Sequence, residues 1–364
     1  MIKRILFILH FTPPVHGSSV VGEQIRDSRL INNTIDGHYI NLNTSRSLNE
    51  IGRMSTKKVL RYSNILRDVF VELLLNRPAI SYIAITATGV AFYKDAIIVL
   101  LTKIFGVKTI LHLHNKGVST RQNKVLDNIL YKLVFSNSEV IILSKYLYID
   151  IKKYVNENRL HICFNGIPEV CGKVHKAENP IVTILFLSNL IESKGVFILL
   201  EACKLLEQNG INFQCVFVGG EGDISDFEFK AYTKKLHLHN HVVFVGKKYG
   251  IEKEELFLGA DIFAFPTYYP YECLPLVLLE AMQFSLPVIS TYEGGIPDVV
   301  IDKKTGFLIR QENVLELAEK LEELIYNKEL RAKMGNAGRK LYEEKFTNDH
   351  FESRMHEILT SITK

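Results

Sequence analysis

The sequence predicts an α/β protein built from two doubly wound domains, and three observations support this. Apolar strand-like runs alternate with helical patterns along the whole chain, which is typical of right-handed βαβ units and of parallel sheets covered on both faces. The 364 residues exceed the usual size of one domain. Charge divides the chain, because residues 1–170 carry a net charge of +10 and the remaining residues carry −6.

The composition is that of a folded, reducing-compartment protein. Hydrophobic residues make up 47% of the chain, which excludes a disordered chain. The five cysteines form no CxxC pair and no metal-ligand spacing, which fits free thiols. The N-terminal run MIKRILFILHF is interpreted as a first buried strand, because Pro13 and Pro14 follow where a signal peptide would be cleaved. No uncharged apolar run reaches transmembrane length.

Twelve strands are expected, and the loops after them should carry the chemistry, because ligands of open parallel sheets bind at the carboxyl ends of strands. The domain boundary is expected within Ile167–Asn179, which gives domains of residues 1–170 and 171–346. In chain order the expected strands are Lys3–Leu9, His38–Leu42, Ile80–Ile85, Lys108–His114, Val140–Leu143, Leu160–Cys163, Ile181–Leu187, Phe213–Val218, Val242–Phe244, Ile262–Phe265, Pro287–Ser290 and Gly306–Ile309.

The loop after the first strand, FTPPVHGSSVVGEQI, contains Gly17 and leads into a helix. Such a loop presents backbone N–H groups, which suits a phosphate or an acceptor hydroxyl. An ordinary strand-to-helix turn explains the same residues. The dinucleotide fingerprint GxGxxG is absent, because four residues separate Gly17 from Gly22.

Residues 56–75 form an amphipathic helical pattern with a basic side. Together with the positive first half, this pattern favours docking on an anionic membrane surface. A helix that covers the sheet and turns its basic side to solvent is the alternative.

Two histidines lie at the end of the fourth strand. His112 and His114 alternate onto one face, and Asn115 and Gly117 follow. A ligand-binding role and a buried core histidine both fit this pattern. Zinc is disfavoured, because no third ligand is signalled nearby.

In the second half, a strand ends near Ser188, and Lys194-Gly195 starts a helix. A lysine at a helix N-terminus opposes the helix dipole, which favours anions there. The position makes sense if Lys194 and the helix end share an anionic ligand such as a diphosphate, and solvent exposure is the alternative. Later strand exits with Gly219 and Gly246 could bring backbone close to a ligand or simply form turns.

Two carboxylates, Glu272 and Glu280, lie at the two ends of an otherwise apolar segment. Pro275 suits the first position of a helix that runs to about Phe284, with Glu272 in the loop before it. A buried carboxylate needs a partner. Backbone amides with an Arg or Lys, or the hydroxyls of a ligand, would each supply one.

These motifs assemble into a recognisable order. Residues 181–346 contain, in this order, NLIESKG, VFVGGEGD, GADIFAFPT, the two glutamates with seven residues between them, LLEAMQFSLPVIS, GGIPDVV and KTGFLI. This half resembles the retaining glycosyltransferases of family 4, the glycosyl transferases group 1. The first half resembles them more loosely, through the Pro13–Ser19 loop, His114-Asn115, Ser144 and Asn165-Gly166.

The resemblance implies the GT-B fold, in which two facing Rossmann-like domains form the active-site cleft and a C-terminal helix, here within residues 347–364, crosses back to the first domain. It implies that residues 1–170 bind the acceptor, that residues 171–346 bind a nucleotide-sugar, and that the sugar is transferred with retention of its anomeric configuration.

The resemblance also implies roles for single residues. Glu280 would hold the ribose, Glu272 the hydroxyls of the donor sugar, Lys194 the diphosphate, and His114 would lie near the anomeric centre. The other donor-binding residues implied are Gly17, Ser188, Asn189, Gly219, Gly246, Lys247, Cys273 and Leu274.

One position departs from the family pattern. The family usually has an arginine a few residues before the lysine, and here Ser188 or Asn189 stands in that place. We expect Lys247 or Lys248 to supply the missing charge. No metal is expected, because the chain contains no Asp-x-Asp and Lys194 with helix dipoles would neutralise the leaving group.

The sequence therefore predicts a glycosyltransferase that transfers a sugar from a UDP-sugar to a saccharide or lipid-linked acceptor in the synthesis of bacterial surface polysaccharide or lipopolysaccharide. The expected location is the cytoplasm, including the inner face of the membrane. A GT-B epimerase acting on a UDP-sugar and a non-catalytic sugar-nucleotide binding subunit are the alternatives. An NAD dehydrogenase is disfavoured by the missing fingerprint, and a nucleic-acid binder by the lack of an aromatic-basic module.

Overall fold

The structure is a computed structural model that describes residues 4–14, 16–45, 55–170 and 180–363. The chain divides into two compact units. The first unit consists of Met1–Gly166 with Asn348–Lys364, and the second of Ile167–Thr347. The division falls close to the expected limit at residue 170. Most of the expected boundary segment, residues 171–179 with Cys171, lies outside the described residues.

The first unit contains a six-stranded parallel sheet in the order β2-β1-β3-β4-β5-β6. The apolar runs predicted these strands, and the ends differ by one or two residues. The largest shifts are at β2 and β5, which both begin two residues earlier than expected, and at the edge strand β2 Asp36 pairs with Arg4 at 2.8 Å. The strands are β1 Arg4–Leu9, β2 Asp36–Asn41, β3 Ile80–Ile85, β4 Lys108–Leu113, β5 Ser138–Ile142 and β6 Leu160–Ile162.

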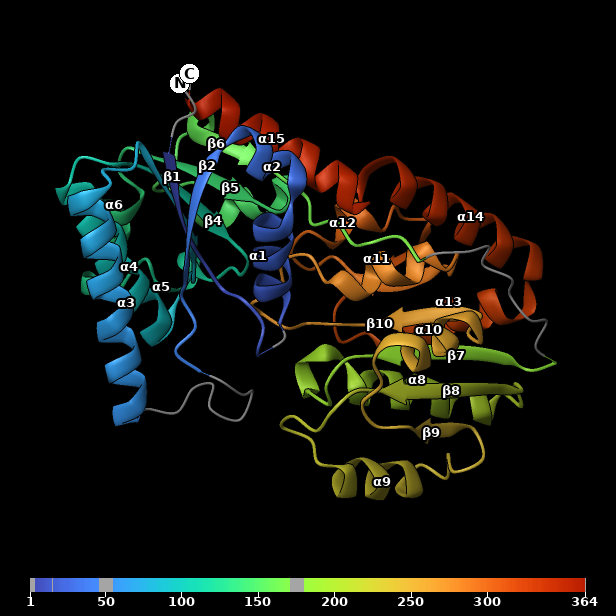
Figure 1. Cartoon of the computed structure of the whole chain (residues 1–364). Helices are drawn as coiled ribbons and strands as arrows, with labels where there is room; N and C mark the ends of the chain where they lie inside the picture. Colours follow the sequence, from blue (N-terminus) through green and yellow to red (C-terminus); the bar gives the residue numbers. More distant parts are fainter. Residues whose placement is uncertain (1–3, 15, 46–54, 171–179, 364) are drawn as a thin grey trace. The chain divides into compact units, whose positions relative to one another are not determined.

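The helices of the first unit cover both faces of this sheet (Figure 1). Right-handed crossovers place α3, α4 and α6 on one face and α1 and α2 on the other, where the C-terminal helix α15 packs beside α1 and α2. The amphipathic pattern of residues 56–75 is α3. The helices are α1 Gly17–Asp27, α2 Arg29–Thr34, α3 Thr56–Leu75, α4 Gly89–Ile104, α5 Val118–Arg121, α6 Val125–Phe135, α7 Tyr148–Ile151 and α15 Asn348–Thr363, with short 3-10 turns η2 Lys145–Leu147 and η3 Glu157–Arg159.

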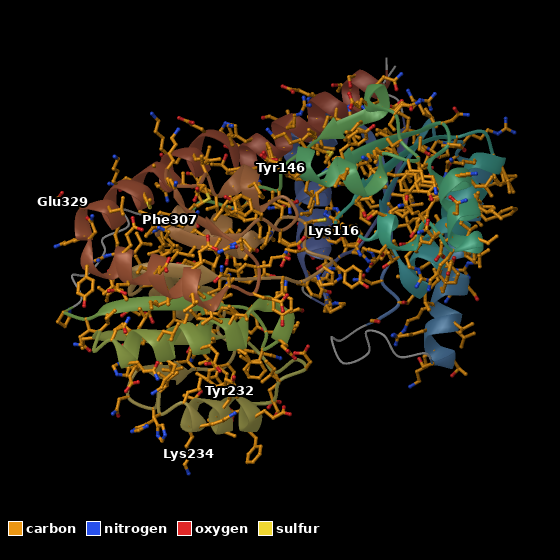
Figure 2. The ribbon with its side chains drawn as sticks, turned by 180° about the vertical axis from the view of Figure 1, so that it is seen from behind. Lys116, Tyr146, Tyr232, Lys234, Phe307 and Glu329 are labelled. Carbon is orange, nitrogen blue, oxygen red and sulfur yellow. The ribbon has the colours of Figure 1, made fainter. Side chains whose placement is uncertain are left out.

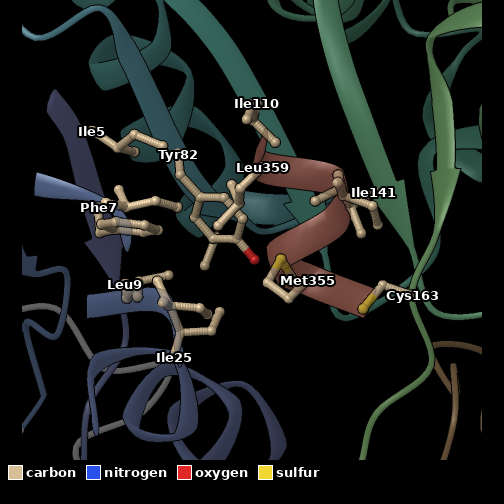
Figure 3. Close-up of a cluster of buried hydrophobic side chains, with 14 of the residues drawn as sticks. Ile5, Phe7, Leu9, Ile25, Tyr82, Ile110, Ile141, Cys163, Met355 and Leu359 are labelled. Atoms are coloured by element: carbon tan, nitrogen blue, oxygen red, sulfur yellow. The ribbon is translucent and has the colours of Figure 1, made fainter. Parts of the chain in front are cut away.

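The C-terminal helix α15 completes the core of the first unit, as the sequence predicts. Met355 and Leu359 of this helix pack against Phe7, Tyr82 and Ile110 of the sheet (Figure 3). Polar contacts at the helix rim add to this, since the Arg354 side chain donates to the Ile162 carbonyl and the Ser28 hydroxyl donates to Glu352. Without α15, the apolar face of the central strands would be exposed to water.

The second unit contains another six-stranded parallel sheet, in the order β12-β11-β10-β7-β8-β9. The strand order reverses between β7 and β10, and ligands of such sheets bind beside that switch point. All six expected strands are present. They are β7 Val182–Leu187, β8 Phe213–Val218, β9 Val242–Phe244, β10 Ile262–Phe265, β11 Val288–Thr291 and β12 Gly306–Ile309.

The described part of the second unit also contains seven helices and the 3-10 turn η4 (Glu192–Lys194), of which α13 and α14 follow the last strand. In α9, Tyr232 packs on Phe197 of α8 and donates a hydrogen bond to Glu201, while Lys234 points to solvent (Figure 2). The helices are α8 Val196–Gln208, α9 Asp226–Lys235, α10 Gly250–Leu258, α11 Leu276–Gln283, α12 Ile296–Val299, α13 Val314–Tyr326 and α14 Lys328–Lys345.

The start of α11 corrects one expectation. Pro275 was expected as the first helical residue, and it is the N-cap residue instead, with φ −65° and an extended ψ of 122°. The helix begins one residue later, at Leu276. As expected, Glu272 lies in the loop before the helix and Glu280 lies within it.

Candidate active site

The carboxyl edge of the second sheet gathers the site residues predicted for this unit. The loops after β7, β8, β9 and β10 all emerge at this edge, on both sides of the switch point. Close backbone approaches join them, since the Ser193 carbonyl after β7 accepts a hydrogen bond from the Tyr268 N–H after β10 at 2.8 Å. In chain order these loops and α11 carry Ser188, Asn189, Lys194, Gly219, Gly246, Lys247, Glu272, Cys273, Leu274 and Glu280.

Lys194 and Glu272 form an ion pair at this edge. Their side chains are only 15% and 10% exposed, and the Lys194 ammonium also lies 4.5 Å from the centre of the Tyr269 ring. Burial, with a smaller contribution from the Glu272 charge, raises the pKa of Tyr269. The backbone positions Lys194 through Gly195 (φ +91°), where a Cβ atom would lie 2.3 Å from the Pro266 carbonyl oxygen. This arrangement fixes a cation and a carboxylate at the start of α8.

Glu280 forms a second lysine pair, and the sequence had left open whether a basic residue or a ligand would meet it. Lys253 of α10 donates a hydrogen bond of 2.7 Å to Oε1 of Glu280. The other carboxylate oxygen, Oε2, is buried and has no hydrogen-bond partner in the described part of the chain. A buried acceptor without a donor is costly, so this oxygen is suited to a donor supplied by a ligand.

The N-terminus of α11 lies between these two pairs along the chain. Gly294 (φ +53°) lies so close to the Glu272 carbonyl that a Cβ atom would be 2.3 Å away, and the Gly295 N–H donates to the Cys273 carbonyl. The Cys273 and Leu274 side chains are buried. No side chain caps α11, and within the described residues the Leu274 N–H donates to no backbone carbonyl. The helix therefore presents uncapped N–H groups, which favour an anion.

The glycine loops after β7, β8 and β9 meet at one place. The Gly219 N–H donates to the Gly246 carbonyl at 3.0 Å, and a Cβ on Gly219 would lie 1.9 Å from the Ser188 carbonyl oxygen. The Asn189 side-chain carbonyl accepts a hydrogen bond from the Gly220 N–H at 3.1 Å. Asn189 therefore holds the loop after β8 in place and adds no positive charge to the site.

Lys247 and Lys248, the two lysines expected to supply the charge of the missing arginine, have different surroundings in the structure. Lys248 forms an ion pair with Glu252 at 2.6 Å. Lys247 lies against Gly220, where a Cβ would be 2.1 Å from its Cε atom, and its ammonium has no carboxylate partner among the described residues. Lys247 is thus the better placed of the two to meet an anion.

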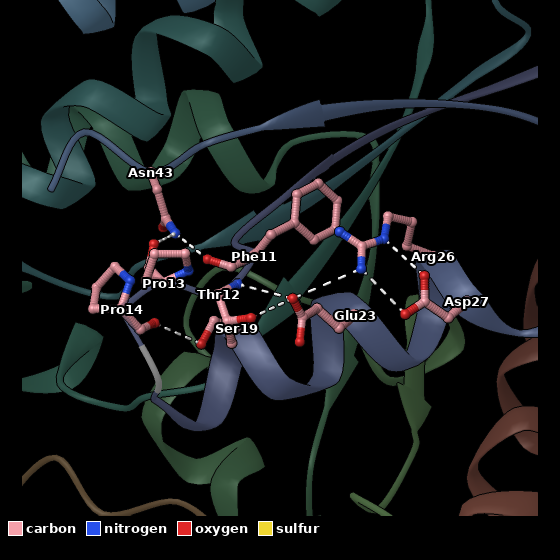
Figure 4. A network of polar contacts seen from close by, with 9 residues as sticks. All are labelled: Phe11, Thr12, Pro13, Pro14, Ser19, Glu23, Arg26, Asp27 and Asn43. Carbon is pink, nitrogen blue, oxygen red and sulfur yellow. Dashed lines mark hydrogen bonds and ion pairs between the residues drawn. The ribbon is translucent and has the colours of Figure 1, made fainter. Parts of the chain in front are cut away.

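In the first unit, Gly17 is the first residue of α1, and no neighbouring atom lies within 4 Å of where its Cβ would be. Packing therefore does not require glycine there. The loop before it is held by Asn43, Ser19 and Glu23, since Ser19 donates to the Pro14 carbonyl and the Thr12 N–H donates to Glu23 (Figure 4). Val15 of this loop lies outside the described residues.

His114 belongs to a cluster of four histidines at the carboxyl ends of β1 and β4. The rings of His112 and His114 are 4.0 Å apart, as expected for one face, and those of His10 and His16 are 5.5 Å apart. Burial lowers the pKa of His10 to about 4 and that of His112 to about 3, while burial and the three neighbouring imidazoles lower that of His114. Burial lowers the pKa of His16 as well, so the surroundings favour the neutral form of all four rings.

His10 was missed by the sequence analysis, although it also lies at the carboxyl end of a strand. Its ring proton can be assigned from neighbours. The Asn43 amide nitrogen donates to the Phe11 and Pro13 carbonyls, so its oxygen accepts from Nδ1 of His10 at 2.7 Å. Nε2 of His10 therefore carries a lone pair.

Lys253 was also missed, because nothing in a helical lysine 27 residues before Glu280 signals their contact.

Two absences hold for residues 4–14, 16–45, 55–170 and 180–363. No three His, Cys, Asp or Glu side chains in these ranges are arranged to bind a metal ion. No helix in the same ranges combines the length and the apolar character needed to cross a bilayer.

Comparison with known proteins gives a family match for most of the second unit. Residues 173–341 match the model of the glycosyl transferases group 1. An uncharacterized glycosyltransferase of Methanocaldococcus jannaschii is 29% identical over 261 residues, which cover 71% of this chain and 69% of that protein. The capsular polysaccharide biosynthesis glycosyltransferase CapM of Staphylococcus aureus is 27% identical over 197 residues, 53% of this chain and 49% of CapM, so the match spans about half of that relative.

The likeness to solved structures extends over nearly the whole chain. Anabaena HepE, crystallised with UDP and glucose, matches with a TM-score of 0.73 at 16% identity. The matched region covers 99% of this chain and 100% of the HepE chain. At this identity the likeness shows the fold. Residues 173–341 thus match the glycosyl transferases group 1 family, and the two Rossmann-like units of the chain have the GT-B fold.

Proposed function

We propose that this protein is a retaining, metal-independent glycosyltransferase that takes a sugar from a nucleotide-sugar, with a UDP-sugar as the first candidate. One observation carries the proposal. Glu272 and Glu280, at the two ends of one apolar segment, are each paired with a lysine at the carboxyl edge of the second sheet, and Glu280 keeps one buried oxygen open. The family match and the UDP and glucose bound to Anabaena HepE support it.

In the proposed complex, each element of the site binds a different part of the donor. Oε2 of Glu280 accepts a hydrogen bond from a ribose hydroxyl, which satisfies the open oxygen. The uncapped N-terminus of α11 and the Lys247 ammonium bind the diphosphate. Glu272 accepts hydrogen bonds from hydroxyls of the transferred sugar. Two acids thus bind two different polyols, and positive charge lies between them.

Lys194 has the central role in the proposed chemistry. The transition state has oxocarbenium character at the sugar and negative charge on the diphosphate, so a cation fixed before the reaction lowers the barrier most. The ion pair with Glu272 holds the Lys194 ammonium in place. Lys194, Lys247 and the α11 N-terminus together would supply the neutralisation that a metal supplies in other enzymes.

We propose same-face attack for the transfer, in which the acceptor hydroxyl bonds to the anomeric carbon as the bond to the diphosphate breaks. The leaving phosphate oxygen takes the hydroxyl proton, so no separate base is needed. The role of His114 beside the anomeric centre remains a prediction from the family resemblance.

We further propose a glycan or lipid-linked saccharide acceptor in the assembly of bacterial surface polysaccharide. The similarity to CapM supports this acceptor class. The four described cysteines are buried thiols, which fits a reducing, cytoplasmic location.

The experiment that tests the proposal is a screen of UDP-, GDP- and ADP-sugars for hydrolysis and for transfer to saccharide acceptors, with the anomeric configuration of the product read by NMR. We expect one nucleotide to be preferred and the product to retain the donor configuration, without added metal and in the presence of a chelator. An inverted product or chelator-sensitive transfer would contradict the mechanism. A changed sugar without any acceptor would instead identify an epimerase.

A further inference from the structure

Three neighbouring helices of the first unit expose apolar side chains in regular rows. On α4, Val90, Ile97 and Ile104 recur every seven residues and are 62%, 50% and 80% exposed. Side chains seven residues apart lie on the same face of a helix, because seven residues complete nearly two turns. The solvent side of α4 is therefore an apolar row along its whole length.

The helices on either side of α4 repeat this feature. On α3, Leu60, Val71 and Leu74 lie on one exposed face, and on α6 the exposed row is Val125, Ile129 and Leu133. Each helix also has a second, buried apolar side toward the sheet. A helix that only covers a sheet presents polar residues to water. The outward rows thus have no role in the packing of the first unit.

The three rows belong to one continuous surface. The Tyr62 hydroxyl of α3 donates to the Lys94 carbonyl of α4, and the Tyr93 hydroxyl of α4 donates to Asp127 of α6. α4 contacts both α3 and α6, and all three helices lie on the same side of the sheet in Figure 1. We call the outer side of these three helices the docking face. It consists of Leu60, Val71, Leu74, Val90, Ile97, Ile104, Val125, Ile129 and Leu133 with the basic residues around them.

The second unit provides an internal comparison. Among its described helices, none exposes more than two large apolar side chains, and those of α13 are Leu315 and Tyr326 near its two ends. The concentration of exposed apolar residues is therefore a property of the docking face and not of the protein surface in general.

Charge selects the partner of the docking face. Residues 55–135 contain 12 Lys and Arg against four Asp and Glu. Three of the four acids, Glu72, Asp95 and Asp127, are buried, so Asp68 is the one acid of this segment at the surface. Exposed lysines such as Lys57 flank the apolar rows. Apolar rows edged by cations are the pattern of surfaces that lie on anionic bilayers.

We propose that the docking face binds the surface of an anionic lipid bilayer, with the apolar rows of α3, α4 and α6 in the interfacial region and the lysines at the headgroups. A second copy of the chain would bring like charges together on this face, which disfavours a dimer there. The inference rests on the proposed function only for the acceptor, which we take to be lipid-linked. The docking itself rests on the surface.

Vesicle flotation of the full chain tests the proposal. Vesicles of phosphatidylcholine with phosphatidylglycerol are compared with vesicles of phosphatidylcholine alone, at low and high salt. The double variant Ile97→Glu, Ile129→Glu removes two apolar rows, and Leu315→Glu, Tyr326→Glu is the matched control with the same charge change in the second unit. We expect the wild type and the control to float with anionic vesicles at low salt, and the double variant to partition at least about tenfold more weakly.

Further readouts separate this inference from the proposed function. Circular dichroism checks that the double variant is folded, and transfer to a soluble saccharide should be unchanged, because the docking face lies outside the candidate site. Failure of the wild type to float, or flotation of the double variant equal to that of the control, would overturn docking even if transfer is normal. A dimer that the same substitutions dissociate would assign the face to a second copy and overturn it as well. Absence of transfer with flotation intact would reject only the proposed function.

Discussion

Lys253 holds one carboxylate oxygen of Glu280 at 2.7 Å and leaves the other oxygen buried without a donor. The pair joins α10 to α11 and lies at the same sheet edge as the Lys194–Glu272 pair. A fully satisfied carboxylate would indicate a structural ion pair. The half-satisfied carboxylate of Glu280 keeps one acceptor open, and we propose that a ligand supplies the donor.

Replacement of Glu280 tests this relationship directly. Glu280→Gln should weaken nucleotide binding by roughly 10- to 100-fold, because a hydrogen bond to a charged acceptor contributes about 1.5–3 kcal/mol. Calorimetric titration with UDP measures the change. Glu255→Gln, on the exposed side of α10, is the control and should bind UDP normally. Equal affinity in both variants would remove Glu280 from the nucleotide site.

Glu272 should matter for turnover and much less for nucleotide binding. Glu272→Ala removes the carboxylate proposed to bind sugar hydroxyls, so we expect turnover to fall by about two orders of magnitude or more while UDP still binds. Steady-state kinetics with calorimetry on the same preparation checks both parts. Near-normal turnover would reject the role.

The two neighbouring lysines after Gly246 should behave differently. Lys247→Met should weaken UDP binding by about tenfold, because its ammonium has no carboxylate partner among the described residues and can meet the diphosphate. Lys248→Met should change it little, because Lys248 is paired with Glu252. Comparison with uridine, which lacks the diphosphate, shows whether the loss depends on phosphate. The reverse order of effects would exclude Lys247.

The C-terminal helix should be essential for the stability of the first unit. Met355→Ala should lower the free energy of unfolding by about 2–4 kcal/mol, because it leaves a cavity against the central strands. Ser361→Ala, on the exposed side of α15, is the control and should change stability by less than about 0.5 kcal/mol. Urea denaturation followed by circular dichroism measures both. Similar values would show that α15 adds little to the core.

The histidine cluster should make the first unit sensitive to acid. The folded state lowers the pKa of His112 to about 3, below its ordinary value of 6.5, so the unfolded state binds more protons as the pH falls. Above pH 6.5 the titration of His112 does not lower the free energy of unfolding. From pH 6.5 down to about pH 3 it lowers that free energy by up to about 1.4 kcal/mol per pH unit. His112→Phe should reduce that slope between pH 6.5 and 4, measured by urea denaturation. An unchanged slope would contradict the proposed linkage.

Local sequence determined most of the architecture. The apolar runs located all twelve strands, because a strand buried in a parallel sheet must be apolar on both faces. The exceptions are instructive. The edge strand β2 begins with polar residues, of which Asp36 pairs with Arg4. Pro275 is the residue just before the first helical residue of α11 and makes no capping hydrogen bond. In both cases the local pattern fits two alternatives that differ by one or two residues.

The sequence alone also determined which residue types stand after which strands, and hence the two glutamates, Lys194 and His114 as candidates. The tertiary structure decided their partners. Whether Glu280 meets a lysine or a ligand was open in the sequence, and the fold shows that Lys253 donates to one oxygen while the other has no donor among the described residues. The same holds for the grouping of His10 with His114 and for the three rows of the docking face. These contacts join residues far apart in the chain, and only packing of whole elements brings them within a few ångströms.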